Sequence, residues 1–198
     1  MRRIHPLCAL ALLLPLCSCT GPTHDQQHAY NEAKLVAEGI VALKVGAVAP
    51  PLSLSGTGAK SLSLPLSSLP GDPLAGWTAL YFFPAPDTPN TAKHLGQLSA
   101  QYDALALDGI SVYALTKAPL EALNAFAAET KTKVPLLADP GGEACVAYAA
   151  LKPGGTYPQR TTVLISPDGR IALYRRGLVL PAELRKAAGL AAPVEKAK

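Results

Sequence analysis

Cysteine, aromatic residues and an excess of one charge are all scarce in this chain of 198 residues. None of its four cysteines forms a CxxC pair, which excludes a dithiol exchanger and a zinc or iron–sulfur site with cysteine ligands. Lys and Arg number 18 against 14 Asp and Glu, and they are scattered, whereas a nucleic-acid-binding face needs them clustered. We therefore expect no nucleic acid as a partner, and we predict no metal and no other cofactor.

Long hydrophobic runs are also lacking, since no apolar run reaches the roughly 20 residues of a membrane-spanning helix. The run Leu7–Leu16 follows Arg2 and Arg3 and precedes small residues, which is the pattern of a signal peptide. Its end, Leu16-Cys17-Ser18-Cys19, resembles the lipobox of bacterial lipoproteins. On that template Cys19 becomes the diacylated new amino terminus.

This interpretation divides the chain into a signal peptide (1–18), a tether (19–44), a folded domain (45–190) and a tail (191–198). Two alternatives stay open: lipidation at Cys17, which the bulky Leu16 disfavours, and a secretory signal cleaved near Ser18 without a lipid. The lipobox resemblance implies a lipid anchor on the periplasmic side of the bacterial envelope. It favours the outer membrane, because Thr20 stands where an Asp would retain a lipoprotein at the inner membrane.

The folded domain then keeps a single thiol. Cys8 and Cys17 leave with the signal peptide and Cys19 carries the lipid, so only Cys145 remains. One thiol cannot form an internal disulfide, even in an oxidising compartment.

Strands and helices alternate through the folded domain. Alternating apolar residues and turn residues predict strands at 52–54, 61–64, 77–83, 110–115, 134–138, 161–165 and 170–174. Helical periodicity predicts helices at 91–107, 119–130, 142–150 and 181–188. This order predicts an α/β thioredoxin-like fold, with a mainly parallel central sheet, a C-terminal β-hairpin, helices on both faces and an N-terminal β-hairpin extension.

Four segments in this order resemble segments of the peroxiredoxins, the alkyl hydroperoxide reductase and thiol-specific antioxidant (redoxin) family. They are Val45–Pro50 (VGAVAP), Leu80–Pro84 (LYFFP), Leu136–Gly142 (LLADPGG) and Arg160–Gly169 (RTTVLISPDG). The resemblance covers about Val45–Leu190. It implies an antioxidant oxidoreductase, and a homodimer, which is common among peroxiredoxins.

The active-site template of that family is Pro-x-x-x-Thr-x-x-Cys with a distant Arg. Laid on this chain it gives Pro84 and Thr88, with Thr91 in place of the peroxide-attacking cysteine, and Arg160 as the distant Arg. That cysteine works as a thiolate, held at a helix amino terminus where its pKa is lowered. A threonine hydroxyl needs a strong adjacent base to become a nucleophile, and the sequence places none obviously beside Thr91.

The sequence therefore favours a degenerate member of the family, a binding or structural module without peroxidase activity. Whether it is an enzyme stays open, because the alternative is an active thiol-dependent peroxidase that uses Cys145. An inward-facing stripe of its predicted helix contains Cys145, and this favours the role of a small core residue for that thiol.

The degenerate site has two interpretations of its own. A helix amino terminus beside Thr88, Thr91 and Arg160 can bind a small anion or a peroxide-like ligand. Alternatively, Thr88 or Thr91 caps the helix with its hydroxyl and Arg160 is a surface residue of the hairpin.

Overall fold

The computed structural model describes residues 43–64, 76–152 and 154–190. The predicted signal peptide, all but the last two residues of the tether, and the tail lie outside the described residues. The described elements are β1 (Leu52–Ser55), the 3-10 helix η1 (Thr57–Ala59), β2 (Ser61–Leu64), β3 (Trp77–Phe82), α2 (Pro89–Ser99), α3 (Tyr102–Leu107), β4 (Ile110–Thr116), α4 (Leu120–Thr130), β5 (Leu136–Ala138), α5 (Glu143–Ala147), β6 (Thr161–Ile165), β7 (Ile171–Arg176) and α6 (Pro181–Ala187). No helix in these ranges is long and apolar enough to cross a membrane.

The central sheet has five strands in the order β5-β4-β3-β6-β7. β3, β4 and β5 pair in parallel, whereas β6 pairs antiparallel with β3 and β7 antiparallel with β6. The predicted α/β fold and both predicted hairpins are confirmed. The sheet is mixed, because its two C-terminal pairings are antiparallel and its other two are parallel.

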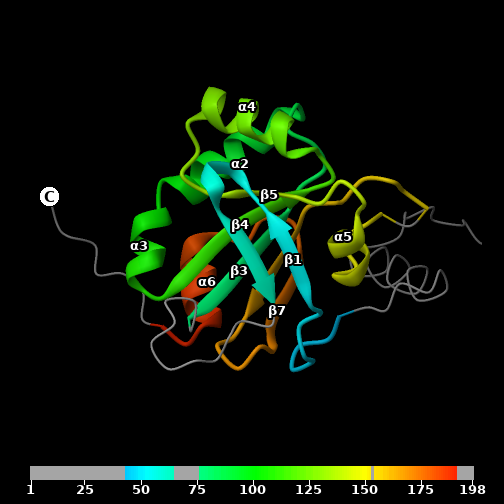
Figure 1. Cartoon of the computed structure of the whole chain (residues 1–198). Helices are drawn as coiled ribbons and strands as arrows, with labels where there is room; N and C mark the ends of the chain where they lie inside the picture. Colours follow the sequence, from blue (N-terminus) through cyan, green and yellow to red (C-terminus); the bar gives the residue numbers. More distant parts are fainter. Residues whose placement is uncertain (1–42, 65–75, 153, 191–198) are drawn as a thin grey trace, which may run out of the picture.

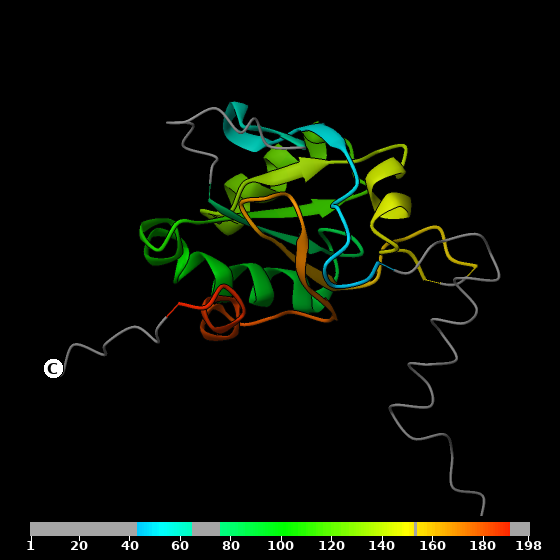
Figure 2. The same cartoon turned by 90° about the horizontal axis from the view of Figure 1, so that it is seen from below.

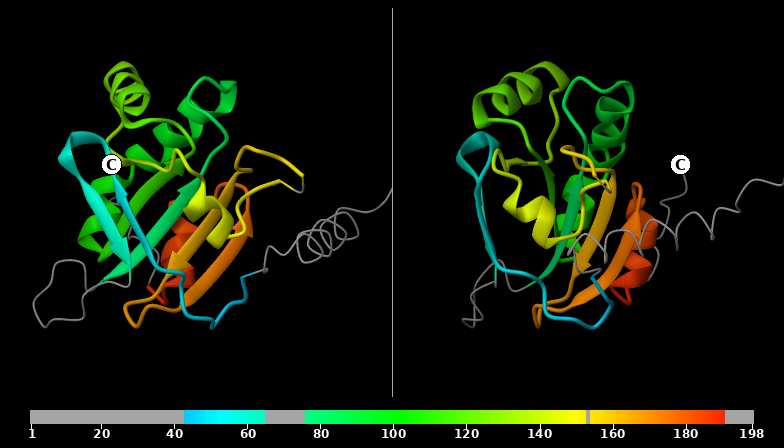
Figure 3. Two further views of the ribbon diagram at one scale, coloured as in Figure 1. Left: turned by 45° about the vertical axis from the view of Figure 1, so that its right-hand side comes forward. Right: turned by 90° about the vertical axis from the view of Figure 1, so that its right-hand side faces the viewer.

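Two apolar clusters cover the two faces of the sheet. Successive residues of a strand point to opposite faces, so Leu80 and Phe82 of β3 join one cluster while Ala79 and Tyr81 join the other. The β1–β2 hairpin and α5 cover the first face, and α2, α3, α4 and α6 contribute to the second (Figure 1). Figure 2 shows the hairpin on one side of the sheet with α3 and α6 on the other. In the right-hand view of Figure 3, α5 lies on the hairpin's side and α6 on the far side.

The tip of the β1–β2 hairpin is fastened to β5, an edge strand of the sheet. Gly56 forms a β-bridge with Leu137, and the Leu136 N–H donates to the Thr57 hydroxyl at 3.0 Å. A Cβ on Gly56 would lie 2.6 Å from Leu137 Cδ2 and 2.9 Å from the Leu136 carbonyl oxygen. Only glycine therefore lets the tip approach this edge so closely.

The apolar stripe over 91–107 predicts one helix, but the structure has two, α2 and α3. The backbone leaves the helical region at Gln101, with φ −116° and ψ 7°. Ser99, the last residue of α2, is bonded through its hydroxyl to the Thr132 hydroxyl at 2.8 Å. This contact fixes the end of α2 against the segment before β5, and α3 turns so that Leu105 packs fully buried on the sheet.

Candidate functional site

The candidate site lies where β3 passes into α2, at the carboxyl end of the central strand. The Phe83 N–H donates to the Leu115 carbonyl at 3.0 Å, and the Thr116 hydroxyl donates to the Pro84 carbonyl at 3.1 Å. Both bonds fix the start of the connecting loop against β4. The helix then begins at Pro89, a position where proline's missing N–H costs nothing.

Two threonine hydroxyls meet at the first turn of α2. Thr91 is fully buried, and its Oγ1 lies 2.5 Å from Thr88 Oγ1. Each hydroxyl also lies within bonding distance of the Ala85 carbonyl oxygen, at 2.9 Å for Thr88 and 3.0 Å for Thr91. The two hydroxyl protons are thus shared among three contacts, one between the threonines and two with the Ala85 carbonyl. Neither a hydroxyl nor a carbonyl is a base strong enough to take the Thr91 proton.

The capping bond expected of these threonines is absent. Thr88 is the residue before the helix, but its hydroxyl bonds to no helical N–H and turns back to the Ala85 carbonyl. Thr91 lies inside the first turn, where its N–H donates to the Thr88 carbonyl at 2.9 Å. The threonine side chains fasten the loop and leave the helix amino terminus without a side-chain cap from Thr88.

Arg160 brings a cation to this pair from the residue before β6. Its Nη2 donates to Thr88 Oγ1 at 3.4 Å. Its Nε is buried and has no hydrogen-bond partner in the part of the chain that the structure describes. Arg160 as a whole is half-buried, and the structure brings it together with Thr88 and Thr91, next to the loop that starts at Pro84.

Tyr81 and His94 extend the site, and the template alone does not find them. The Tyr81 hydroxyl lies 2.7 Å from His94 Nδ1. Burial raises the pKa of Tyr81 to about 12, although the charge of Arg160 acts in the opposite direction. Burial first, then the charges of Arg160 and Lys93, lower the pKa of His94, which favours the neutral imidazole.

Cys145 belongs to α5 and packs on the other face of the sheet, in the apolar cluster that this helix covers. None of its surface is exposed, and its backbone N–H donates to the buried Asp139 carboxylate at 2.8 Å. Burial, followed by a hydrogen bond with Asp139, raises the pKa of the thiol. The structure therefore does not bring Cys145 together with Thr91, whose helix packs on the opposite face.

Two further predictions concern the lipid and metals. Cys19 lies outside the described residues. Within the described ranges no group of three or more His, Cys, Asp or Glu side chains is placed to hold a metal ion.

A fully buried threonine therefore lies at the first turn of the helix after the central strand, with an arginine beside it. A family model described as the AhpC/TSA family matches residues 45–174. The chain belongs to the AhpC/TSA family. No curated protein matches the sequence.

Solved structures share the fold of this AhpC/TSA member at low identity. AhpC from Enterococcus faecalis is 22% identical with a TM-score of 0.64, and covers 74% of this chain and 91% of its own. A cysteine-to-serine mutant of PrxQ from Xylella fastidiosa is 19% identical with a TM-score of 0.62, covering 74% and 94%. Peroxidoxin BcpB from Mycobacterium tuberculosis is 21% identical with a TM-score of 0.60, covering 74% and 95%.

Proposed function

We propose that this AhpC/TSA member has no peroxidase activity and serves as a lipid-anchored binding or structural module of the bacterial envelope. The observation that carries the proposal is Thr91. Its hydroxyl occupies the turn where a peroxidatic thiolate would stand, and it is bonded to Thr88 and the Ala85 carbonyl. Without an adjacent base, this hydroxyl cannot attack a peroxide oxygen.

The position of the remaining thiol supports the same proposal. Attack on peroxide needs a thiolate that is accessible. Cys145 is fully buried, its pKa is raised, and it lies across the sheet from Arg160. It has neither the ionisation nor the neighbours of a peroxidatic cysteine.

The competing function is an active peroxidase that uses Cys145. The bacterioferritin comigratory protein of Xanthomonas campestris, which is 20% identical to this chain, has alkyl peroxide reduction activity. The two functions differ in what they predict for Cys145.

Peroxide consumption decides between them. The starting protein carries serine at Cys8, Cys17 and Cys19, so that Cys145 is its only thiol, and a dithiol reductant is supplied. We expect no turnover above background from this protein or its Cys145→Ser variant, and peroxide consumption from Thr91→Cys, which gains a thiol beside Arg160. Turnover by the starting protein that Cys145→Ser abolishes would refute the proposal.

The binding role that we propose for the degenerate site is capture of a small anion. Arg160 supplies a fixed positive charge and a buried Nε without a described partner, beside the amino terminus of α2. A sulfate titration followed by NMR should shift the Thr88 amide and the Arg160 side-chain signals, and the shifts should disappear in Arg160→Met. If these signals stayed unperturbed throughout the titration, the proposed anion binding would be wrong and only a structural role of the site would remain.

A further inference from the structure

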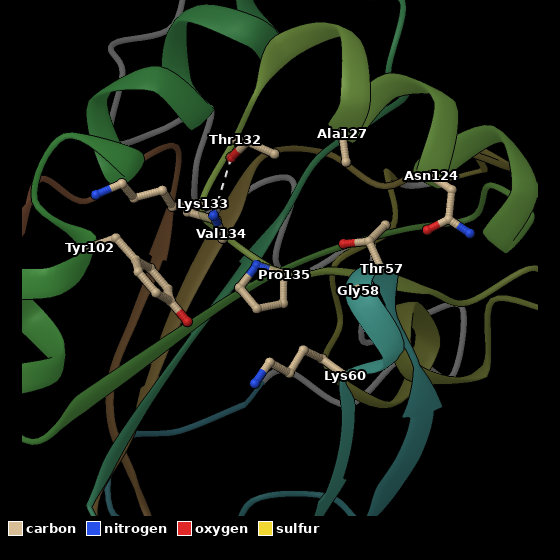
Figure 4. A pocket seen from close by; sticks show the side chains of 10 residues that line it. All are labelled: Thr57, Gly58, Lys60, Tyr102, Asn124, Ala127, Thr132, Lys133, Val134 and Pro135. Atoms are coloured by element: carbon tan, nitrogen blue, oxygen red, sulfur yellow. Dashed lines mark hydrogen bonds between the residues drawn. The ribbon is translucent and has the colours of Figure 1, made fainter.

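A second hollow, with no lining residue in common with the Thr88–Thr91–Arg160 site, lies between the hairpin tip and α4. Its volume is about 450 Å³. The polar side chains that matter here are those of Lys60, Tyr102 and Asn124, and Pro135, Val134 and Ala127 supply an apolar floor (Figure 4).

Two sets of hydrogen bonds hold the walls of this hollow in place. On the hairpin side, the Leu136 N–H donates to the Thr57 hydroxyl, and the backbones of Gly56 and Lys60 are bonded at 2.7 Å. On the other side, the Thr132 hydroxyl is bonded to that of Ser99 at 2.8 Å and accepts from the Val134 N–H at 3.2 Å. The hollow is therefore formed before any ligand arrives, which lowers the cost of binding.

Three polar side chains line this hollow, of which Lys60 and Asn124 are exposed and Tyr102 is half-buried. Within the described ranges, the Lys60 ammonium, the Tyr102 hydroxyl and the Asn124 amide make no hydrogen bond or ion pair. Figure 4 shows the Lys60 ammonium and the Tyr102 hydroxyl turned toward the same space beside the Pro135 ring, with Asn124 at the opposite end. Burial, and then the charge of Asp103, raise the pKa of Tyr102, so its hydroxyl stays protonated and can donate.

The charge of the hollow favours an anionic ligand. Lys133 also lines it, but its ammonium is paired with the Asp103 carboxylate. Lys60 therefore contributes one positive charge without a partner, and Tyr102 adds a neutral donor. A carboxylate can accept from both, while an apolar body covers Pro135 and Val134.

We propose that this hollow binds a small organic monoanion, a carboxylate on a compact apolar body, through Lys60 and Tyr102. This site is independent of the proposed loss of peroxidase activity and of the Arg160 anion site.

The test uses the full-length protein in detergent and 4-fluorobenzoate as the probe, observed by fluorine NMR line broadening. We expect Lys60→Met to weaken binding about tenfold, because a hydrogen bond to a charged group is lost, and Tyr102→Phe about fivefold. Lys152→Met, which removes an exposed lysine outside the hollow, should leave binding unchanged. The neutral 4-fluorobenzamide should bind at least tenfold more weakly than the benzoate.

Equal binding of the benzoate to wild type and Lys60→Met would overturn the proposal. So would equal binding of the neutral amide, or a benzoate signal lost only in Arg160→Met. If inorganic phosphate binds with Lys60 dependence while fluorobenzoate does not bind, the site takes an inorganic anion and the proposal of an organic ligand is wrong.

Discussion

Cys145 and Val146 are neighbours in α5, but the first is fully buried and the second is 48% exposed. Cys145 packs among apolar side chains while its N–H holds the Asp139 carboxylate. At the scale of single residues, position 145 of this short helix is therefore closed to solvent, whereas the next position, 146, is open to it.

Thiol reactivity tests this difference. In the protein with serine at Cys8, Cys17 and Cys19, we expect Cys145 to react with a disulfide reagent at least about a hundredfold more slowly in native buffer than in denaturant, since attack requires local opening. A control that combines Cys145→Ser with Val146→Cys should react natively at close to its denatured rate. Similar native rates for the two thiols would contradict the burial of Cys145.

His94 gives a pH dependence whose sign follows from its environment. Its pKa is lowered in the folded protein, first by burial and then by the charges of Arg160 and Lys93. The unfolded chain therefore binds the proton at a higher pH than the folded chain does. The stability contribution is complete above about pH 6.5, the ordinary histidine value, and is lost as the pH falls from there toward the folded-state pKa.

We expect the urea midpoint of the wild type to fall more steeply between about pH 7 and about pH 5 than that of His94→Gln. His5, His24 and His28 are present in both proteins and cancel in the comparison. Parallel curves for the two proteins would show that His94 is not coupled to folding.

At the scale of elements, the contact between the hairpin tip and β5 depends on one glycine. A Cβ at Gly56 would overlap both a side chain and a backbone oxygen, whereas a Cβ at Gly96, in the exposed part of α2, meets no atom within 4 Å. The same substitution should therefore have opposite effects at the two positions.

We expect Gly56→Ala to destabilise the protein by about 1–3 kcal/mol through overpacking, and Gly96→Ala to stabilise it by up to about 1 kcal/mol through helix propensity. Urea unfolding of the two variants measures both changes. A neutral result at Gly56 would mean that the tip does not lie against β5.

Elements with a strong local pattern could be predicted from the sequence. The 166–169 turn and the helix end at Gly109 depend on local glycines, and both Gly109 and Gly169 have positive φ, at 74° and 77°. The break between α2 and α3 could not be predicted, because it depends on a bond from Ser99 to Thr132, 33 residues away. An apolar stripe that continues through the break conceals it.

The candidate site divides in the same way. The residues Thr88, Thr91 and Arg160 follow from a family template, and the structure does place them together. The Tyr81–His94 bond joins a strand and a helix, and the spacing of the two residues in the sequence does not predict that they meet. The only sequence signal is that a tyrosine in a buried strand usually needs a partner for its hydroxyl.

At the scale of the whole molecule, the proposed attachment depends on a residue far from the folded domain. If Cys19 carries the lipid, replacing it should abolish anchoring, whereas replacing Cys17 should leave anchoring intact. The two cysteines lie two residues apart in the sequence, so each serves as the control for the other.

We expect a bacterial host to incorporate labelled palmitate into the wild type and into Cys17→Ala, and not into Cys19→Ala. Fractionated membranes should contain the wild type in the outer membrane and Thr20→Asp in the inner membrane. If Cys19→Ala incorporated as much label as the wild type, the lipid would be attached to another residue and the proposed anchor would be wrong.

The burial of Cys145 also determines how the domain withstands oxidants. The chain has one methionine, Met1, so residues 45–190 contain a single sulfur atom, and that atom is shielded from solvent. Hydrogen peroxide reaching the folded surface finds no sulfur to convert to sulfenic or sulfonic acid. Such a domain needs no repair by a reductase and keeps its shape in an environment where proteins with exposed thiols and thioethers accumulate damage.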